Sequence, residues 1–456
     1  MINGSFRKYL EEAIGSVNAL VAFSAFESPA SVSVRINPFK KGLAPDGREV
    51  AWNAYGRILP ERPVFTLDPH FHAGAYYVQD SSSMFVGYVF RSLLQNVEKP
   101  AGRPFRVLDL CAAPGGKTTD LAASLREAFG DDFLLVSNEV MKARAGVLAD
   151  NVALWGDPNV VVTSDDPRAF AALPGFFDMI VADVPCSGEG MFRKDEQAQH
   201  QWSEDNVALC EARQRRITAD VWPSLRQGGT FIYSTCTFNK YENDGNVEWI
   251  AAVLGADCLF ADDVLQPGNG VIRTSAGYSL VPGHVEGEGQ YCSALIKTAE
   301  VGFGDCSQKS LRPSKAQTVA GDIASGLLKV KSVFRLKGDT LIAIPENLAS
   351  DLASLEQALH IIAAGCAVGT LKGKVLVPDA DLALSTAFDR KAFPEAEVDR
   401  DTALAYLHRD AIVLSDAPKG YVTIVYEGLP IGFVKNLGNR CNSLHPQSRR
   451  IRMNIK

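Results

Sequence analysis

Between residues 105 and 236, short apolar runs alternate with longer segments of helical periodicity, and this alternation strongly constrains the fold. The apolar runs are RVLDLC, DFLLVSNE, NVVVTSDD, FFDMIVADVP and QGGTFIYSTC. Strands that alternate with helices favour an α/β domain with a doubly wound parallel sheet. In such a sheet, ligands bind at the carboxyl ends of the strands.

Each predicted strand ends on a polar or reactive residue. These residues are Asp109, Glu139, Asp166, Asp183 and Cys236. Because the carboxyl ends of parallel strands meet at one edge of a sheet, we expect these side chains to share a site. A lone cysteine is usually a small buried hydrophobe. Because five predicted strands all end on polar or reactive residues, a functional role for Cys236 is favoured instead.

The first predicted strand is followed by the glycine-rich turn CAAPGGKTT, which begins at Cys111. Its GKT matches the end of a P-loop, but Cys111 stands where that motif needs glycine, so a P-loop NTPase is a poor match. A tight turn before a helix still lets a ligand approach backbone N–H groups. Glu139 is placed to bind two ribose hydroxyls. Together they predict a nucleoside cofactor such as S-adenosylmethionine; the alternative is a structural turn with a surface glutamate.

The composition excludes several classes of protein. The chain has 456 residues and a net charge of −7, so it is not a uniformly basic nucleic-acid binder, although one local basic surface remains compatible. No apolar run reaches the ~18 residues that a membrane helix needs, and the N-terminus is unlike a secretory signal. Nine scattered cysteines without a CxxC pair predict reduced thiols, a cytoplasmic protein and no metal site.

The chain divides into four expected segments. Residues 1–103 form an N-terminal extension, with a helical lead-in, the strand SVSVRINPF and a loop-rich section up to residue 75. The α/β domain spans 104–300, and an intermediate α/β domain spans 301–386 behind the linker-like RPSKAQTVAGD. In the last segment, 387–456, YVTIVYEGLPIGFVKNLG predicts a β-hairpin with its turn at EGLP.

Three motifs carry a resemblance to a known family. CAAPGGK, DVPCSGEG and STCT occur in this order and together resemble the RNA 5-methylcytosine methyltransferases of the NOL1/NOP2/Sun family, most closely the bacterial type that acts on 16S rRNA. SVRIN and YYVQDSSSM are similar to its N-terminal motifs, and GLPIGFVKNLGNRCNSLHPQSRRIR to its PUA-like domain. The resemblance implies a Rossmann-like methyltransferase domain, an N-terminal α/β extension that binds RNA, and a C-terminal PUA-like β-rich domain.

The resemblance also implies catalytic roles. C5 of cytosine cannot attack a methyl sulfonium unaided, and a thiolate that adds to C6 makes C5 nucleophilic. Cys236 is the expected nucleophile, and Cys186 is expected to assist removal of the C5 proton and release of the enzyme. Asp183 is expected against the amino edge or N3 of the base.

The family pattern further implies a binding set for S-adenosylmethionine. Residues 111–117 would hold its methionine portion, Glu139 its ribose, and Asp166 would lie near the adenine. For Asp166, a helix N-cap ahead of Pro167 is the alternative. The complete set is Cys111, Ala112, Ala113, Pro114, Gly115, Gly116, Lys117, Glu139, Asp166 and Asp183.

A target base in folded RNA must be flipped out before a thiol can reach it, so domains that hold RNA are expected. The last 17 residues are basic and contain no acid. They favour a phosphate-contact patch, with a solvated face as the alternative. The candidate RNA-contact residues are Arg35, Asn37, Lys194, Arg440, Arg449, Arg450 and Arg452.

The predicted activity is therefore methylation of cytosine C5 in 16S rRNA, free or in the 30S subunit, by a monomeric enzyme. One alternative is the same chemistry on tRNA. Another is a non-catalytic RNA-binding factor for ribosome assembly, but such a factor would need neither Cys186 nor Cys236.

Overall fold

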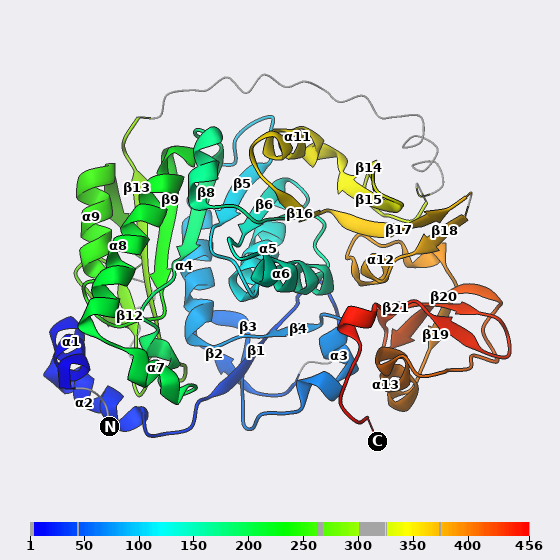
Figure 1. Cartoon of the computed structure of the whole chain (residues 1–456), viewed down its shortest axis with the longest axis horizontal. Helices are drawn as coiled ribbons and strands as arrows, with labels where there is room; N and C mark the ends of the chain where they lie inside the picture. The colour runs from blue at the N-terminus through cyan, green and yellow to red at the C-terminus, as the bar shows by residue number, and fades with distance from the viewer. Residues whose placement is uncertain are drawn as a thin grey trace.

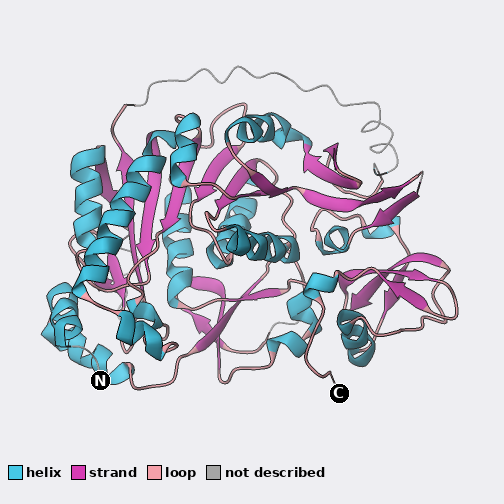
Figure 2. Ribbon diagram, in the orientation of Figure 1, coloured by secondary structure: helices cyan, strands magenta, loops and turns pink. Residues whose placement is uncertain are grey.

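The computed structural model describes residues 4–42, 45–261, 268–300, 324, 326–373 and 375–455. The linker predicted at RPSKAQTVAGD lies outside the described residues. Within the described ranges, the strands form one sheet of ten strands and three sheets of four (Figures 1 and 2). None of the helices in these ranges combines the length and apolarity that crossing a bilayer requires.

The N-terminal segment contains two helices and an antiparallel sheet of order β2-β3-β1-β4. The predicted helical lead-in and the strand in SVSVRINPF are confirmed, whereas the predicted loop-rich section is wrong in part because it contains β2 and β3. The elements are α1 (Gly4–Ile14), α2 (Ser16–Ala25), β1 (Val32–Ile36), β2 (Arg48–Val50), β3 (Asn53–Leu59), α3 (Pro69–His72) and β4 (Tyr76–Val78).

The centre of the large sheet is parallel, as predicted, with the order β9-β8-β5-β6-β7. Its strands are β5 (Phe105–Asp109), β6 (Phe133–Asn138), β7 (Val160–Thr163), β8 (Phe177–Asp183) and β9 (Leu225–Thr235). The crossovers contain α5 (Gly116–Phe129), α6 (Lys142–Trp155), the short 3-10 helices η3 (Pro167–Ala172) and η4 (Glu189–Met191), α7 (Glu196–Gln201) and α8 (Glu204–Val221).

Both edges of this sheet are antiparallel, and they lie outside the five strands that the sequence predicts as parallel. β13 pairs with β9, and β16 from the intermediate segment pairs with β7. β12 is antiparallel to β13 as well, because the connection between them is too short for the crossover that parallel strands need. The added elements are α9 (Asp244–Leu254), β10 (Ala256–Leu259), β11 (Ile272–Arg273), β12 (Tyr278–Leu280), β13 (Gln290–Lys297) and β16 (Ile361–Ala364).

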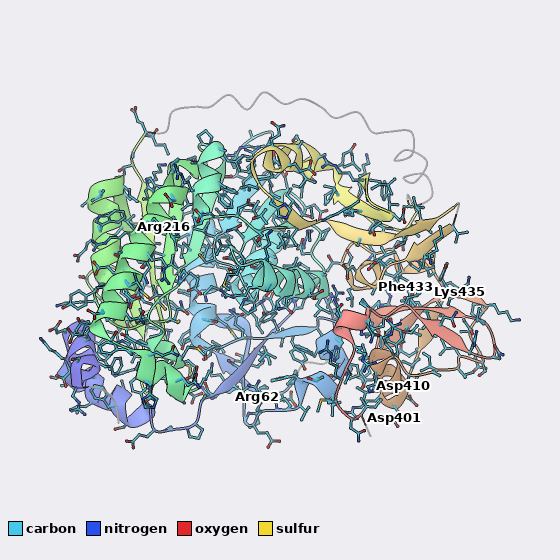
Figure 3. All side chains as sticks on the ribbon, in the orientation of Figure 1. Arg62, Arg216, Asp401, Asp410, Phe433 and Lys435 are labelled. Carbon is cyan, nitrogen blue, oxygen red and sulfur yellow. The ribbon has the colours of Figure 1, made fainter. Side chains whose placement is uncertain are left out.

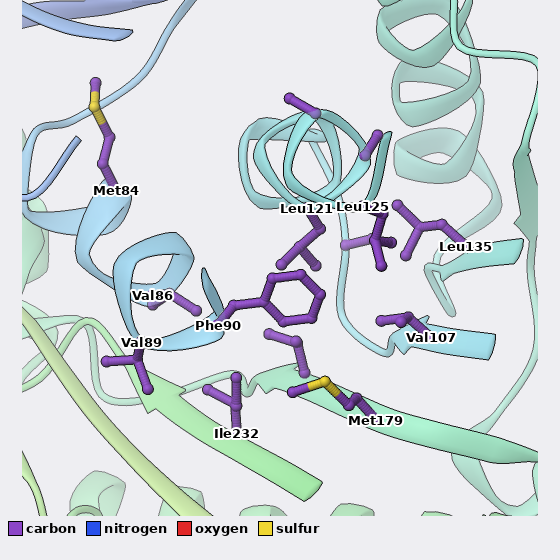
Figure 4. Close-up of a cluster of buried hydrophobic side chains, with 14 of the residues drawn as sticks. Met84, Val86, Val89, Phe90, Val107, Leu121, Leu125, Leu135, Met179 and Ile232 are labelled. Atoms are coloured by element: carbon purple, nitrogen blue, oxygen red, sulfur yellow. The ribbon is translucent and has the colours of Figure 1, made fainter. Parts of the chain in front are cut away.

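Alternate side chains of the central strands pack on opposite faces of the sheet. Val107 and Leu135 contact the layer of α4 (Phe85–Leu94), α5 and α6, where Phe90 fills the space between the helices and the strands (Figure 4). Their neighbours Leu108 and Val136 face α8, α9 and α11 (Ala349–Ala358). This period-two burial on both faces keeps the strands rigid and positions their carboxyl ends.

The remaining sheets have the orders β14-β15-β17-β18 and β19-β20-β21-β22. The hairpin predicted at YVTIVYEGLPIGFVKNLG is confirmed, because β20 and β21 are joined through Glu427 and Gly428, both with positive φ. The elements are β14 (Ser332–Lys337), β15 (Thr340–Pro345), β17 (Cys366–Lys372), β18 (Val375–Pro378), α12 (Ala380–Leu384), β19 (Glu395–Glu397), α13 (Arg400–His408), β20 (Gly420–Tyr426), β21 (Leu429–Asn436) and β22 (Cys441–Ser443).

Candidate active site

The candidate site lies where the strand order of the large sheet reverses. β5 and β8 are neighbours, although the chain passes through β6 and β7 between them. A crevice at such a reversal, outside the carboxyl ends of the strands, is where open α/β sheets bind ligands. The turn after β5 and the loops after β8 and β9 meet at this edge, as the sequence predicts.

The two motif cysteines face each other at this edge. The Sγ atoms of Cys186 and Cys236 are 3.2 Å apart. Both cysteines are half-buried, between neighbours that are mostly buried. The thiol hydrogen bond with Cys236 and burial raise the pKa of Cys186 well above its ordinary value. Cys186 therefore carries a proton at neutral pH in the free protein.

Asp183 is held beside the cysteines by three donors. Its Oδ2 accepts from Lys117 Nζ at 2.8 Å, and its Oδ1 accepts from Ser234 Oγ at 2.7 Å and from Gln290 Nε2 at 2.9 Å. Burial opposes the charge of Lys117, but the attraction of Asp183 outweighs it and raises the pKa of the lysine. Lys117, predicted only as part of the cofactor turn, thus also positions Asp183.

Gly190 packs directly under the loop that carries Cys236. Its N–H donates to the carbonyl oxygen of Cys236 at 2.7 Å. A Cβ at this position would lie 2.8 Å from that oxygen and 3.4 Å from Cys236 Cβ. The loop must therefore shift if any side chain is added here.

We expect Gly190→Ala to lower kcat by about 100-fold, since displacing a reacting group by about 1 Å has this effect. Methyl-transfer kinetics measure it, and circular dichroism monitors the fold. Gly146→Ala is the matched control, because a Cβ on Gly146 meets no atom within 4 Å. An unchanged rate for Gly190→Ala would contradict the expected displacement of Cys236.

The turn 111–117 fits the methionine portion of S-adenosylmethionine. α5 begins after Gly115, which has a φ of 114° and provides no side chain to cap the first N–H groups of the helix. Free N–H groups at a helix N-terminus favour a carboxylate, which the methionine portion carries. Arg35 Nη2 donates a hydrogen bond to the carbonyl oxygen of Gly116 at 3.2 Å and so stabilises the turn.

Acidic groups surround the base of this turn. Burial, followed by the negative charges of Asp109, Asp183 and Glu139, raises the pKa of Cys111 far above its ordinary value. Burial raises the pKa of Asp109 to about 7, and its Oδ1 has no hydrogen-bond partner. A region of negative potential favours a cation, and the sulfonium of S-adenosylmethionine is one. The residues present therefore fit this cofactor.

Glu139 and Asp166 follow β6 and β7 but differ in their surroundings. Glu139 is buried; its Oε1 accepts from the N–H of Met141 at 2.9 Å, and its Oε2 lies 3.1 Å from Arg144. A carboxylate with two such contacts retains lone pairs for ribose hydroxyls. Asp166 is the N-cap of η3 and accepts from the N–H of Arg168 at 3.0 Å. Its carboxylate lies 3.7 Å from Arg216, a residue of α8 that is labelled in Figure 3. The capping alternative is thus present, and contact with adenine stays a prediction.

The structure corrects two predicted RNA contacts in the N-terminal segment. Arg35 is completely buried, donates to Gln79 Oε1 at 2.9 Å, and lies 4.6 Å from the ring of Trp155. Asn37 is also buried, and its amide donates to the carbonyl oxygens of Gly74 and Trp155. Both side chains join the N-terminal sheet to the large domain and are not available to phosphates.

The predicted C-terminal contacts divide into two groups. Arg449 is paired with Asp150 at 2.9 Å and Asp381 at 2.5 Å, which corrects its assignment as a phosphate contact. In contrast, Arg440, Arg450 and Arg452 are exposed, on the same unit as the exposed Lys435 (Figure 3). Lys194, whose side chain is 38% exposed and 3.9 Å from Asp80, also stays a candidate.

Residues outside the predicted set also shape the site. They are Gln290, which contacts Asp183, and the buried Glu189, Asn239 and Glu242, which lie around the cysteine loops. Burial, together with the nearby Glu189, raises the pKa of Glu242 to about 7. In the sequence, the polar residues that cluster just after each cysteine motif could have indicated that these side chains belong to the site. Among the described residues, no group of three or more His, Cys, Asp or Glu is arranged to hold a metal ion.

Three family models match the chain. The one described as 16S rRNA methyltransferase RsmB/F matches residues 98–296, the RsmF PUA domain matches 393–451, and the N-terminal domain of RsmF matches 2–81. These matches confirm the predicted architecture of a methyltransferase domain between an N-terminal domain and a PUA domain. The boundaries of the four predicted segments stay predictions.

Two curated relatives, both named Ribosomal RNA small subunit methyltransferase F, resemble most of the chain. The protein of Serratia proteamaculans (strain 568) is 31% identical over 393 residues, which cover 82% of this chain and 78% of the relative. The protein of Klebsiella pneumoniae (strain 342) is 28% identical over 453 residues, which cover 93% and 91%.

Solved structures show the same fold. A methyltransferase homolog from Pyrococcus horikoshii has a TM-score of 0.51 at 24% identity and covers 64% of this chain and 93% of its own. NSun6 from Pyrococcus horikoshii, solved with SFG, has a TM-score of 0.52 at 18% identity and covers 65% and 99%. The chain therefore belongs to the RsmB/F family of 16S rRNA methyltransferases, with S-adenosylmethionine as its cofactor.

Proposed function

We propose that this protein methylates C5 of a cytosine in 16S ribosomal RNA through a covalent bond between Cys236 and C6 of the base. The observation that carries the proposal is the pair of thiols at two strand ends, 3.2 Å apart. A non-catalytic RNA-binding factor would have no use for two facing thiols. The motif order and the fold class support the same assignment.

Cys236 acts first in the proposed reaction. Its thiolate sulfur forms a bond to C6, and the electron pair of the C5–C6 double bond moves to make C5 an enamine-like nucleophile. Bound S-adenosylmethionine supplies an electrophilic methyl group. C5 would take that methyl group while it still carries its hydrogen, and the electron pair of the broken S–CH3 bond would stay on the cofactor sulfur as a neutral thioether. The base remains bound to Cys236.

Cys186 acts second. Its thiolate removes the C5 proton, the electron pair re-forms the C5–C6 double bond, and the Cys236–C6 bond breaks with the electrons returning to sulfur. In the free protein, Cys186 is protonated because of Cys236 and burial. Once Cys236 is bonded to C6, its sulfur no longer shares the hydrogen bond with Cys186. The Cys186 thiol then loses its proton to solvent more readily, at the stage that needs its thiolate.

Asp183 and Lys117 assist the attack on C6. Asp183 would face N3 or the amino group of cytosine. A proton at N3, stabilised by this carboxylate, would withdraw electron density from the ring and favour attack at C6. Lys117, Ser234 and Gln290 hold both oxygens of Asp183. A carboxylate held from several sides can direct its remaining lone pairs at the base with little loss of conformational entropy.

The exposed arginines of the C-terminal unit are the proposed phosphate-binding residues. A variant with Arg440, Arg450 and Arg452 all changed to Gln should bind rRNA more weakly, and the slope of log affinity against log salt should fall by about one for each phosphate that is no longer neutralised. Filter binding over a salt series measures both. Lys99→Gln is the control, because Lys99 pairs with Asp132 near the amino ends of β5 and β6. Equal slopes for the triple variant and the control would exclude phosphate binding by these arginines.

The activity is tested with labelled S-adenosylmethionine and three substrates: naked 16S rRNA, 30S subunits and tRNA. After digestion to nucleosides, we expect label in 5-methylcytidine from rRNA or from the subunit. Label in adenosine, or on protein alone, contradicts C5 methylation. Label in tRNA but not in rRNA supports the tRNA alternative and contradicts the rRNA assignment.

A further inference from the structure

The two cysteine loops are joined by a network of buried polar side chains, here called the clasp, that consists of Glu189, Asn239 and Glu242. Glu189 follows Cys186 by three residues, and Glu242 follows Cys236 by six. Both glutamates are completely buried, and Asn239 is nearly so. None of the three is part of the reaction proposed above.

Each glutamate accepts backbone N–H groups from the opposite loop. Glu189 Oε2, on the Cys186 loop, accepts from the N–H groups of Phe238 at 2.6 Å and Asn239 at 3.1 Å. Conversely, Glu242 Oε2, on the Cys236 loop, accepts from the N–H of Ser187 at 3.0 Å. Since Ser187 is adjacent to Cys186 and Phe238 is two residues from Cys236, these bonds join the two loops close to the cysteines.

Asn239 connects the two carboxylates. Its Nδ2 donates to Glu189 Oε1 at 2.9 Å and to Glu242 Oε1 at 2.8 Å. Trp202 and Gln214 add donors from outside the loops, at 2.9 Å to Glu189 and 2.7 Å to Glu242. All four carboxylate oxygens therefore have donors.

Stability alone does not account for this arrangement. Two carboxylates in one buried network repel each other and are removed from water, and apolar side chains of similar volume often stabilise a fold at least as well. Burial, and then the charge of Glu189, raise the pKa of Glu242 to about 7, which reflects the loss of hydration and the repulsion between the two carboxylates. Hydrogen bonds to a buried carboxylate are short and directional, so they hold the groups that donate them in precise positions.

We infer that the clasp sets the separation of the two thiols, so that Cys186 reaches the C5 proton of the base that Cys236 holds. This inference rests on the proposed function. Glu189, Asn239 and Glu242 are positioning residues, because they act through the backbone of the cysteine loops and not on the substrate. Loosening the clasp should therefore impair release of the covalent adduct and change the spacing of the thiols even without RNA.

The first test measures thiol spacing without RNA or cofactor. Diamide, which takes two hydrogens from a pair of thiols, should convert Cys186 and Cys236 to a disulfide quickly, since the sulfurs must approach from 3.2 Å to the S–S bond length. Glu242→Gln places an amide donor against other donors, and Asn239→Ala removes the bridge. Both should slow cross-linking by about tenfold, because placement within about 0.5 Å is no longer maintained. Peptide mapping by mass spectrometry measures the rate.

The second test measures turnover. With RNA and S-adenosylmethionine, both variants should lower kcat by about 100-fold, with the covalent protein–RNA adduct accumulating on a denaturing gel. KM for the cofactor should stay unchanged. Glu248→Gln, on the exposed side of α9, is the matched control and should behave as the wild type in both tests.

The outcomes separate this inference from the proposed function. Wild-type cross-linking rates in Glu242→Gln and in Asn239→Ala overturn the clasp, whether or not methylation occurs. Reduced turnover without accumulated adduct overturns it as well. If neither the wild type nor Cys186→Ala ever forms an adduct, the covalent route itself fails, while the cross-linking test still judges the clasp.

Discussion

Cys236→Ala is expected to abolish methyl transfer to RNA. Without the sulfur nucleophile, C5 of cytosine does not become nucleophilic, and loss of such a group lowers kcat by about 10⁴-fold or more. The half-buried position of Cys236 at the end of β9, facing Cys186, is suited to attack on a base that enters from solvent. Transfer of a labelled methyl group to 16S rRNA measures the effect.

The control for this substitution is Cys258→Ala. Cys258 is also half-buried but lies on β10, away from the reactive edge, and its removal should leave turnover intact. Binding of S-adenosylmethionine, followed by calorimetry, should be equal in the wild type and in Cys236→Ala. Substantial methyl transfer by Cys236→Ala would show that the nucleophile is a different residue.

Cys186→Ala is expected to trap the enzyme on its RNA. The Cys236–C6 bond and the C5–methyl bond can both form, but the C5 proton is no longer removed, so elimination slows by about 100- to 10 000-fold, the range for loss of a general base. A band of protein linked to RNA on a denaturing gel measures the adduct. Nuclease treatment should return that band to the mobility of the free protein.

The decisive control is the double variant Cys186→Ala/Cys236→Ala. It should show no linked band, because the adduct of the single variant depends on Cys236. Normal turnover by Cys186→Ala would refute the assignment of separate roles to the two cysteines. A linked band that persists in the double variant would place the covalent bond on another residue.

The positions of the candidate site residues were predictable because parallel strands impose them. Alternating strands and helices place the carboxyl end of every parallel strand at one edge. Asp183 ends β8, and Cys186 and Cys236 follow β8 and its neighbour β9. The glycine-rich turn was predictable for a similar reason, since it connects a strand to the helix that starts at the same edge. These features depend on local sequence and on one general rule of topology.

Gln290 belongs to the site although it lies at the amino end of a strand, which the rule for parallel strands does not predict. It is the first residue of β13, and β13 runs antiparallel to β9, so its amino end lies at the reactive edge and its side chain reaches Asp183. If β13 ran parallel to β9, this residue would lie at the opposite edge. The direction of an edge strand depends on how the chain returns after β9, which residue patterns alone do not specify.

The sequence by itself determined the family, the α/β architecture and the placement of two motif cysteines at strand ends, because motif order and strand ends are properties of the linear chain. Only the tertiary structure decided which charged residues face the solvent. Arg35 and Arg449 resemble RNA contacts in the sequence, yet Gln79 and Trp155 enclose the first, and Asp150 and Asp381 neutralise the second. Burial and ion pairing depend on partners distant in the chain, and so does the clasp that spaces the two thiols.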